Sequence, residues 1–251
     1  TNAQTSKRWI VKSGYTGTST DTLASIKAAV SGAGQSDTVI VLDGTYKEKI
    51  SFSRWASPGN RKLVLASASP SRKQLLHSIG LKPEIIVSGV DEELPEITSL
   101  PPAEMVIALA ITKAHTVREM VSGDAIIIAC DSTFEFEGES FGKPETPVIA
   151  IERAKRLSGK TGLLHTGHCI IDTKQGRELA DRVTTSVTFD VLSDELIADY
   201  VSTGEPLKVA GGFTLDGFSS PLISAIDGDY TNVVGISMAY LRKSLEHLGY
   251  S

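Results

Sequence analysis

Apolar and polar residues alternate with two different periodicities, that of β-strands and that of α-helices, between Arg61 and the C-terminus. Short apolar runs and alternating runs predict β-strands at residues 62–66, 125–130, 163–171 and 183–191. Apolar residues spaced three and four apart predict helices at residues 70–79, 146–157, 194–201 and 237–248, and another that begins at Pro102. Strands that alternate with helices are typical of an α/β domain with a mixed sheet flanked by helices.

Capping and turn residues predict where several of these elements begin or end. Ser69 is a suitable N-cap, Pro70 suits the first helical position, and Gly80 ends the same helix. A hairpin turn is predicted around residues 137–139, Glu-Gly-Glu. In the helix that begins at Pro102, the apolar face is predicted to contain Met105, Leu109, Ile111 and Ala114.

Residues 1–60 have a different composition and contain seventeen serines and threonines. Ser19 to Asp21 predict the cap of a helix with Leu23 and Ile26 on its apolar face, and residues 38–42 predict a strand. Residues 55–60 include Pro-Gly-Asn and predict a loop. We therefore predict an N-terminal extension, residues 1–60, and a separate domain, residues 61–251.

The extension resembles, over a short string, the N-terminal cap of right-handed β-helix proteins that act on polysaccharides. This string is Asp37-Thr-Val-Ile-Val-Leu-Asp-Gly-Thr-Tyr-Lys-Glu48. A β-helix buries its core by stacking several coils, and residues 1–60 leave room for too few. We assign no activity to the extension. The alternative hypothesis makes it a carbohydrate-binding or polysaccharide-lyase fragment, although it lacks a convincing acid–base constellation.

The bulk composition narrows the class of protein. The chain of 251 residues has a formal net charge of −5, and residues 61–251 carry eighteen Lys or Arg against twenty-six Asp or Glu. Such an acidic domain does not predict a nucleic-acid-binding surface. No apolar run approaches the roughly 18 residues that span a bilayer, so we expect no membrane segment. Cys130 and Cys169 lie in apolar runs, which predicts buried thiols and a cytoplasmic location.

One segment combines a strand end with small hydroxyl residues and a helix start. Ser67 and Ser69 precede the helix, and Arg72 and Lys73 occupy its first turn. Free backbone N–H groups at a helix N-terminus, with cations beside them, favour an anion. The alternative is an ordinary helix cap with solvated charges.

Three further groups are candidates for the chemistry of a phosphate site. Asp131 follows an apolar strand, and a carboxylate at a strand end lies at a sheet edge where ligands bind. Lys143 is presented between Gly142 and Pro144, and residues 91–93, Asp-Glu-Glu, offer the oxygen ligands of hard divalent cations. A turn-forming aspartate, a solvated lysine and an acidic loop are the respective alternatives.

The pair His165 and His168, followed by Cys169, suggests a zinc site at first sight. The run alternates like a strand, so the two histidines are predicted to point to opposite faces. Two histidines and one cysteine also fall short of a closed four-ligand site. We therefore do not predict zinc.

Five ordered motifs resemble those of the Maf family of nucleotide pyrophosphatases, and a sixth, Asp216-Gly217, lies among them. They occur in the order and spacing of the family, and their details are most similar to actinobacterial members. The motifs are Leu63-Val-Leu-Ala-Ser-Ala-Ser-Pro-x-Arg72, Asp131-Ser-x5-Gly-Glu-x2-Gly-Lys-Pro144, Leu157-Ser-Gly-Lys-x4-His165, Thr203-Gly-Glu-Pro-Leu-x2-Ala-Gly211 and Ile226-Asp-Gly-Asp-x2-Asn-Val-Val-Gly235.

The resemblance implies a fold and a reaction. The fold is an ITPase-like mixed sheet flanked by helices, with a cleft between two lobes, in a chain that forms a homodimer. The reaction is hydrolysis of the α–β phosphoanhydride of normal or modified nucleoside triphosphates, giving monophosphate and pyrophosphate with Mg²⁺ or Mn²⁺. The family is also linked to inhibition of septum formation, so the alternative is a nucleotide-binding regulator of septum formation with little catalysis.

The resemblance also implies a role for each matching residue. Asp131 is expected to accept the proton of the attacking water and, with Glu92, to bind the metal. Lys143 is expected to stabilise charge on the leaving pyrophosphate. A set of hydroxyl and cationic side chains is expected to bind the phosphates: Ser67, Ser69, Arg72 and Lys113.

At three positions the chain departs from the usual pattern of the family. Ser71 stands where an arginine is usual, Ser132 where a threonine is common, and Asp216 where pyrimidine-preferring members have glutamine. These positions are thought to affect selection of the base, and an aspartate lacks the amide donor of glutamine. We therefore predict the reaction but not the preferred base.

Overall fold

The computed structural model describes residues 8–11, 22–23, 38–41, 61–215 and 217–250, and the chain divides into two compact units, Thr1–Phe52 and Ser53–Ser251. In the first unit β1 (Arg8–Val11) pairs in parallel with β2 (Thr22–Leu23) and β3 (Thr38–Val41). The predicted strand at residue 38 is confirmed. The predicted helix after Asp21 is wrong at its start, because Thr22 and Leu23 pair with β1 instead. The predicted loop at residues 55–60 lies outside the described residues.

The second unit contains a mixed sheet of seven strands in the order β10-β9-β8-β6-β4-β5, with β7 paired to β6. The strands β6, β8, β9 and β10 are antiparallel neighbours, whereas β4 runs parallel to β6 and β5. The predicted mixed sheet is thus confirmed. The strands are β4 (Lys62–Leu65), β5 (Glu84–Ile85), β6 (Ala125–Phe136), β7 (Glu139–Phe141), β8 (Thr161–Asp172), β9 (Arg177–Phe189) and β10 (Ile223–Asp227).

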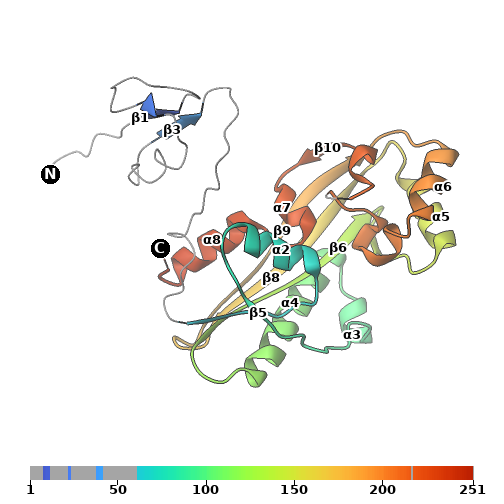
Figure 1. Cartoon of the computed structure of the whole chain (residues 1–251). Helices are drawn as coiled ribbons and strands as arrows, with labels where there is room; N and C mark the ends of the chain where they lie inside the picture. Colours follow the sequence, from blue (N-terminus) through green and yellow to red (C-terminus); the bar gives the residue numbers. More distant parts are fainter. Residues whose placement is uncertain (1–7, 12–21, 24–37, 42–60, 216, 251) are drawn as a thin grey trace. The chain divides into compact units, whose positions relative to one another are not determined.

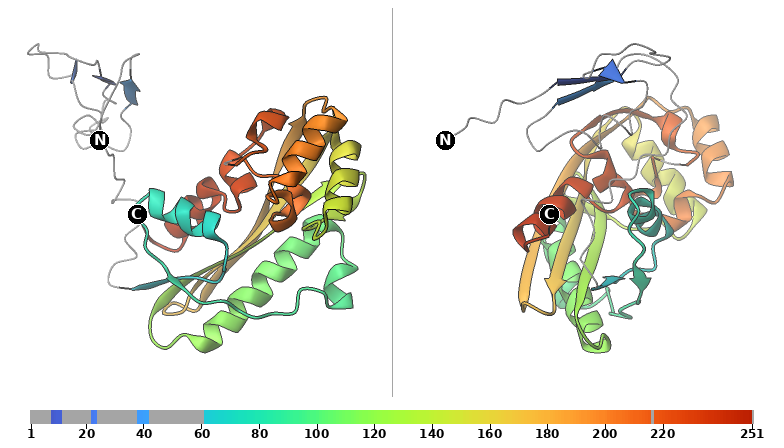
Figure 2. Two further views of the ribbon diagram at one scale, coloured as in Figure 1. Left: turned by 45° about the vertical axis from the view of Figure 1, so that its right-hand side comes forward. Right: turned by 60° about the vertical axis from the view of Figure 1, so that its left-hand side comes forward.

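Helices cover both faces of this sheet (Figures 1 and 2). On one face α4 lies along β6 and β8, and on the other face lie α2, α7 and α8. Short 3-10 helices, η1 to η3, precede β10. The helices are α2 (Pro70–Ser78), α3 (Pro95–Thr98), α4 (Pro102–Met120), α5 (Pro147–Leu157), α6 (Asp194–Ser202), α7 (Tyr230–Val234), α8 (Met238–His247), η1 (Pro206–Lys208), η2 (Ala210–Gly212) and η3 (Ser220–Leu222).

Alternation along the strands fills the two main layers of the core. Ile126 and Ile128 point to the side of α2 and α8, where they pack with Leu76 and Leu245. Ile127 points the other way and belongs to the apolar layer beneath α4. Every one of these side chains is buried. The continuous apolar run of β6 is therefore explained by burial on both faces.

The helix α4 packs closely against the sheet at Gly167 of β8. Gly167 on β8 allows this approach, because a Cβ atom there would come 2.1 Å from the carbonyl oxygen of Val106. The predicted apolar face is confirmed at Leu109 and Ala114, which are buried, and at Ile111, which is half-buried and packs against the core; Met105 is only half-buried. The buried positions of α4 are Val106, Leu109, Ala110, Lys113, Ala114 and Val117.

The strand β6 is longer than predicted, which changes the position of Asp131. It continues to Phe136, and the predicted hairpin follows, with positive φ at Glu137 (53°) and Gly138 (81°). The reason is that β8 pairs with β6 from Ile126 to Glu135. Asp131 therefore lies within a strand and not at its end, as the apolar run alone predicts.

The opposite edge of β6 is paired only in part. On that edge β4 pairs with residues 125–128 and β7 with residues 134–136. No other described strand pairs with residues 129–133 on this edge. Asp131 thus still lies at an open sheet edge. The edge is open because the neighbouring strand β4 ends, whereas β6 itself continues past Asp131.

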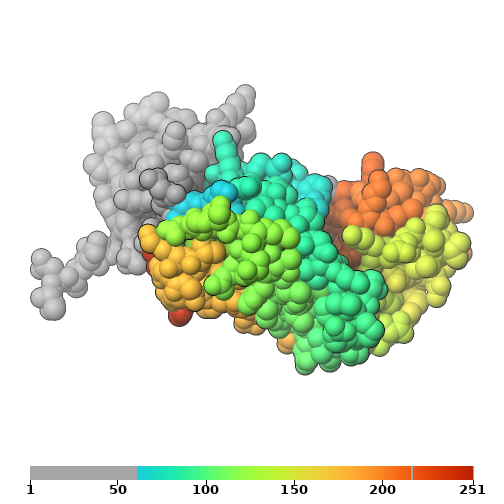
Figure 3. All heavy atoms as spheres, turned by 90° about the horizontal axis from the view of Figure 1, so that it is seen from below, coloured from blue at the N-terminus to red at the C-terminus, as the bar shows by residue number. Residues whose placement is uncertain are grey.

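The helices α5 and α6 cover the end of the sheet formed by β7 and the ends of β8 and β9. Seen from the side of α4, the surface is indented between the green part, with α3 and α4, and the yellow and orange part, with α5 and α6 (Figure 3). Within the described residues, no helix combines the length and apolar character needed to cross a bilayer.

Candidate active site

Arg72 is held by protein acceptors where β4 ends. Its Nη1 donates to the Ser67 hydroxyl at 3.1 Å and to the carbonyl oxygen of Cys130 at 2.8 Å. Its Nη2 donates to the Ser132 hydroxyl at 2.9 Å, and its Nε donates to the carbonyl oxygen of Gly235 at 2.9 Å. We call Ser67, Arg72 and Ser132 the arginine cluster. Within the described part of the chain, no carboxylate forms an ion pair with this guanidinium, so its charge is available to an anion.

The helix α2 begins beside this guanidinium. Ser69 is its N-cap, as predicted, and the hydroxyl of Ser69 accepts the backbone N–H of Arg72 at 3.4 Å. The hydroxyl of Ser67 in turn accepts the N–H of Ser69 at 3.2 Å. The two serines therefore shape the turn that leads into the helix. This places N–H groups of the first helical turn and the guanidinium in one small region.

Lys113 joins two carboxylates on the other face of β6. Its Nζ lies 2.6 Å from Asp131 Oδ1 and 2.6 Å from Glu92 Oε1. We call Glu92, Lys113 and Asp131 the lysine cluster. Lys113 and Asp131 are each 8% exposed, whereas the side chain of Glu92 is 52% exposed. Lys113 is therefore a buried, paired lysine and not an ordinary exposed lysine of a helix surface.

The two clusters meet at consecutive residues of β6. Asp131 belongs to the lysine cluster and Ser132 to the arginine cluster, so their side chains leave the strand on opposite faces. Both residues lie in the stretch of β6 whose one edge has no strand partner. A ligand at this edge can thus reach the carboxylate and the guanidinium together.

The remaining predicted site residues have fewer contacts. Lys143 is exposed two residues after β7, and within the described residues it has no hydrogen bond or ion pair. Ser71 is half-buried in the first turn of α2. Asp216 lies outside the described residues. The roles of these three residues stay predictions.

The histidines of β8 have separate partners on its two faces. His165 contacts Glu135 and Thr184, each at 2.9 Å. His168 is fully buried and its Nε2 accepts the backbone N–H of Ser237 at 2.9 Å. The described residues contain no group of three or more His, Cys, Asp or Glu side chains that could bind a metal. Burial raises the pKa of the Cys130 thiol to about 12, which argues against a nucleophilic thiolate.

The acceptor role of His168 leads to a prediction about acid stability. Burial, and next the Arg72 guanidinium, lower the pKa of His168 to about 4 from its ordinary 6.5. The unfolded chain therefore binds a proton that the folded chain does not between these pH values. Stability should fall by about 3 kcal/mol from pH 6.5 to pH 4 through this residue. Urea unfolding at several pH values measures the effect, and His168→Gln, which keeps an acceptor without titrating, should lose less stability; an equal loss would contradict the assignment.

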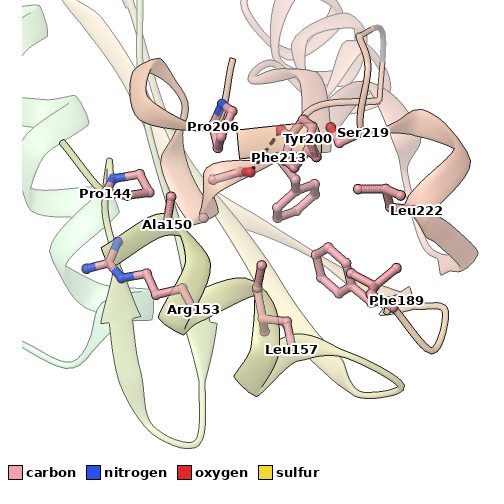
Figure 4. A pocket seen from close by; sticks show the side chains of 14 residues that line it. Pro144, Ala150, Arg153, Leu157, Phe189, Tyr200, Pro206, Phe213, Ser219 and Leu222 are labelled. Carbon is pink, nitrogen blue, oxygen red and sulfur yellow. Dashed lines mark hydrogen bonds between the residues drawn. The ribbon is translucent and has the colours of Figure 1, made fainter. Parts of the chain in front are cut away.

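A pocket lies between α5 and residues 200–222 (Figure 4). Its walls are mainly apolar and aromatic, and Tyr200 donates to the carbonyl oxygen of Gly212 at 3.0 Å. None of the charged residues of the two clusters lines it. The lining residues are Pro144, Ala150, Arg153, Ala154, Leu157, Phe189, Leu192, Tyr200, Pro206, Gly211, Gly212, Phe213, Ser219 and Leu222.

Comparison with known proteins decides the family. A family model described as Maf-like protein matches residues 62–248. The chain belongs to the Maf-like protein family. This confirms the resemblance on which the predicted site residues rest.

Curated relatives of this Maf-like chain carry the name nucleoside triphosphate pyrophosphatase. The protein of Streptomyces coelicolor is 49% identical over 191 residues, which are 75% of this chain and 91% of that protein. The protein of Thermosynechococcus vestitus is 45% identical over 188 residues, 75% of this chain and 94% of that protein. A crystal structure of a nucleoside-triphosphatase, dITP/XTP pyrophosphatase, from Mycobacterium abscessus aligns with 51% of this chain and 72% of that chain, at TM-score 0.29 and 12% identity, a likeness too low to support a conclusion.

Several contacts of the Maf-like site could not be found by reasoning from the sequence. Thr166 and Gly235 contact the arginine cluster directly, and Asn232 contacts it through Thr166; of these three residues, only Asn232 and Gly235 belong to a recognised motif. The only sequence feature that pointed to Asn232 and Gly235 was the motif at residues 226–235. Apart from its aspartates, this motif contains no acid–base or cationic side chain that would suggest a role in the site.

Proposed function

We propose that this chain is a nucleoside triphosphate pyrophosphatase that cuts the α–β phosphoanhydride. The observation that carries the proposal is the lysine cluster beside the arginine cluster, at an open edge of β6, in a chain 49% identical to a protein with that name. A cationic guanidinium without a carboxylate partner suits a phosphate group. A buried carboxylate next to it suits activation of water.

Asp131 is the proposed proton acceptor. Its Oδ1 is bound to Lys113, while its Oδ2 has no hydrogen-bond partner within the described residues. The water oxygen attacks the α-phosphorus as its proton passes to this carboxylate, and the bond from the α-phosphorus to the bridging oxygen breaks. Pyrophosphate leaves with the electron pair. Arg72, with Ser67 and Ser69, is proposed to bind phosphate oxygens, and Lys143 to stabilise charge on the leaving group.

A divalent cation, Mg²⁺ or Mn²⁺, fits the lysine cluster in part. Glu92 and Asp131 present oxygens to one cation, the ammonium of Lys113, at 2.6 Å each. Two carboxylates are the usual protein share of a Mg²⁺ site, with substrate phosphates and water as the other ligands. We propose that these two residues hold the metal, which when bound would neutralise phosphate charge. Lys113 would then move toward the phosphates.

Product analysis tests the proposal directly. The purified protein is given a panel of normal and modified nucleoside triphosphates with Mg²⁺ or Mn²⁺, and pyrophosphate and orthophosphate are detected separately. We expect pyrophosphate and nucleoside monophosphate in equal amounts from the first turnover. Reaction in ¹⁸O-labelled water should place the label in the monophosphate. Orthophosphate as the first product, or label in pyrophosphate, would exclude attack at the α-phosphorus.

A further inference from the structure

The segment Asp229–Gly235, which includes α7, has no part in the proposed chemistry, yet it contacts Arg72 directly. The Nε of Arg72 donates to the carbonyl oxygen of Gly235 at 2.9 Å, across 163 positions of sequence. Gly235 has a φ of 123°, which strongly favours glycine. A Cβ atom at this residue would lie 3.0 Å from Nε and 3.2 Å from Cγ of Arg72. The absence of a side chain at Gly235 therefore makes the position of Arg72 possible.

A second connection runs from Arg72 to the same segment through two hydroxyl groups. Thr166 donates its hydroxyl hydrogen to the carbonyl oxygen of Asn232 at 3.0 Å. Because that hydrogen is used, Ser132 must donate to Thr166 at 2.9 Å, and it accepts from Arg72 Nη2 at 2.9 Å. The chain of donors thus has a single direction, from the guanidinium to α7. Thr166 is fully buried, so water does not compete with it.

The segment itself is fixed by hydrogen bonds of its half-buried and buried polar side chains. A helix of five residues is not stable alone, so these contacts must maintain it. Asp229 caps α7 by accepting the N–H of Thr231 at 2.8 Å, and it accepts the hydroxyl of Ser237 at 2.6 Å. Asn232 donates to the carbonyl oxygen of Leu164 at 3.2 Å. These contacts fix the carbonyl oxygen of Gly235, which accepts from Arg72, and that of Asn232, which accepts from Thr166.

Burial raises the pKa of Asp229, but the hydrogen bonds from Ser237 and Thr231 outweigh it and leave the pKa below its ordinary value. Asp229 is thus ionised at neutral pH. Its carboxylate serves α7 and α8 and makes no ion pair with Arg72 within the described residues. The segment orients the guanidinium directly through the carbonyl oxygen of Gly235 and indirectly through Thr166 and Ser132, without neutralising it.

We propose that the segment Asp229–Gly235 is a positioning element that holds Arg72 in the orientation that binds the phosphates. Gly235 and Asn232 are its positioning residues, and Ser132 acts through Arg72 rather than by reading the base. This inference rests on the proposed function, because it assigns phosphate binding to Arg72. A preoriented guanidinium needs no rearrangement when the triphosphate binds, and a misplacement of about 1 Å can cost 10²-fold in rate.

Gly235→Ala tests the direct contact. We expect a loss of about 10- to 100-fold in kcat/KM for nucleoside triphosphates, because the new methyl group displaces Arg72. Gly249→Ala is the matched control: Gly249 also follows a helix and has a positive φ, 91°, but a Cβ atom there would meet no described atom within 4 Å. Both variants place an alanine at a positive φ, so thermal stability should fall in both, and activity in Gly235→Ala far more. An equal loss of activity in the two variants would overturn the proposal.

A double variant separates positioning from general damage. In an Arg72→Ala background, Gly235→Ala should cause no further loss of kcat/KM, since the residue on which it acts is gone. Independent, additive losses would show that Gly235 acts by another route. If Gly235→Ala does not fold, Ser132→Ala supplies the same comparison through the hydroxyl connection.

Ser132→Ala also decides between positioning and base selection. If Ser132 acts through Arg72, kcat/KM should fall by one common factor for triphosphates of all bases, and not at all in the Arg72→Ala background. If it selects the base, the ratios between bases should change, which would overturn this part of the proposal.

A spectroscopic measurement is independent of activity. The ¹⁵N-labelled Arg72 Nε–H, donated to Gly235, should give a protected NMR signal that is retained in Gly249→Ala and lost in Gly235→Ala. If the wild-type protein hydrolysed no triphosphate, the proposed function would fail while this measurement still tested the positioning. An unprotected signal in the wild-type protein would overturn the positioning itself.

Discussion

Replacement of Asp131 by asparagine is expected to lower kcat by about 10²- to 10⁴-fold, the range typical for loss of a general base. The change keeps the size of the side chain and its place in β6, and Lys113 keeps Glu92 as a partner at 2.6 Å. Fold and nucleotide binding should therefore largely persist. Steady-state kinetics with pyrophosphate detection measures the loss, and far-UV circular dichroism checks the fold.

Two comparisons make the Asp131 result specific. Asp199→Asn, on the exposed surface of α6, changes the charge equally and should leave kcat unchanged. Raising the Mn²⁺ concentration separates the two roles assigned to Asp131: it should restore Glu92→Gln, a proposed metal ligand, more than Asp131→Asn. Full rescue of Asp131→Asn by metal would mean that the residue binds metal and is not the base. Undiminished turnover without added metal would remove it from the mechanism.

Periodicity was sufficient for most elements of the domain. The strands β4 and β8 and the helices α2, α5, α6 and α8 lie within a few residues of their predicted positions, because each buries one apolar side or two. By contrast, β6 ends six residues later and β9 begins six residues earlier than predicted, and periodicity did not predict α3, α7 or β10. The predicted helix near Ser19 was wrong where it can be compared, since pairing of Thr22 with β1 overrides a local capping signal. A capping signal determines the secondary structure of a short segment only when no strand distant in the sequence pairs with that segment.

The candidate site was less accessible to sequence reasoning. Lys113 interrupts the apolar face of α4, and helical spacing alone cannot say whether such a lysine is buried; only the resemblance selected it. Its burial depends on Asp131, eighteen residues later, and on a loop residue, Glu92. The approach of Gly235 to Arg72 depends on how α7 packs against α2, which no local pattern encodes.

The largest effect on stability is expected at Asp172, which joins the two ends of the domain. Its carboxylate is fully buried and accepts two hydrogen bonds from Arg61 Nη1, at 2.7 and 2.8 Å, and one from the Tyr250 hydroxyl at 2.7 Å. Asp172→Asn leaves the mostly buried Arg61 without a counter-charge, so we expect a loss of about 3 to 5 kcal/mol in the free energy of unfolding. Both tryptophans lie within residues 1–60, so circular dichroism in urea, not tryptophan fluorescence, should be the measurement.

Asp124→Asn is the matched control for Asp172, because Asp124 forms a half-exposed ion pair with Lys174 at 3.4 Å close to the same turn. Its expected cost is below about 1 kcal/mol, since solvent screens an exposed pair. Asp172 pairs with Ile126 at the far end of β6 from Asp131, so kcat of the folded Asp172→Asn protein should not change.

The ion pair between Arg61 and Asp172 also tests the proposed domain of residues 61–251. A chain that begins at Arg61 keeps this ion pair and should fold, whereas one that begins at Leu63 should lose as much stability as Asp172→Asn. Equal stability of the two truncated chains would mean that Arg61 contributes nothing and that the ends of the domain are held together by apolar packing alone.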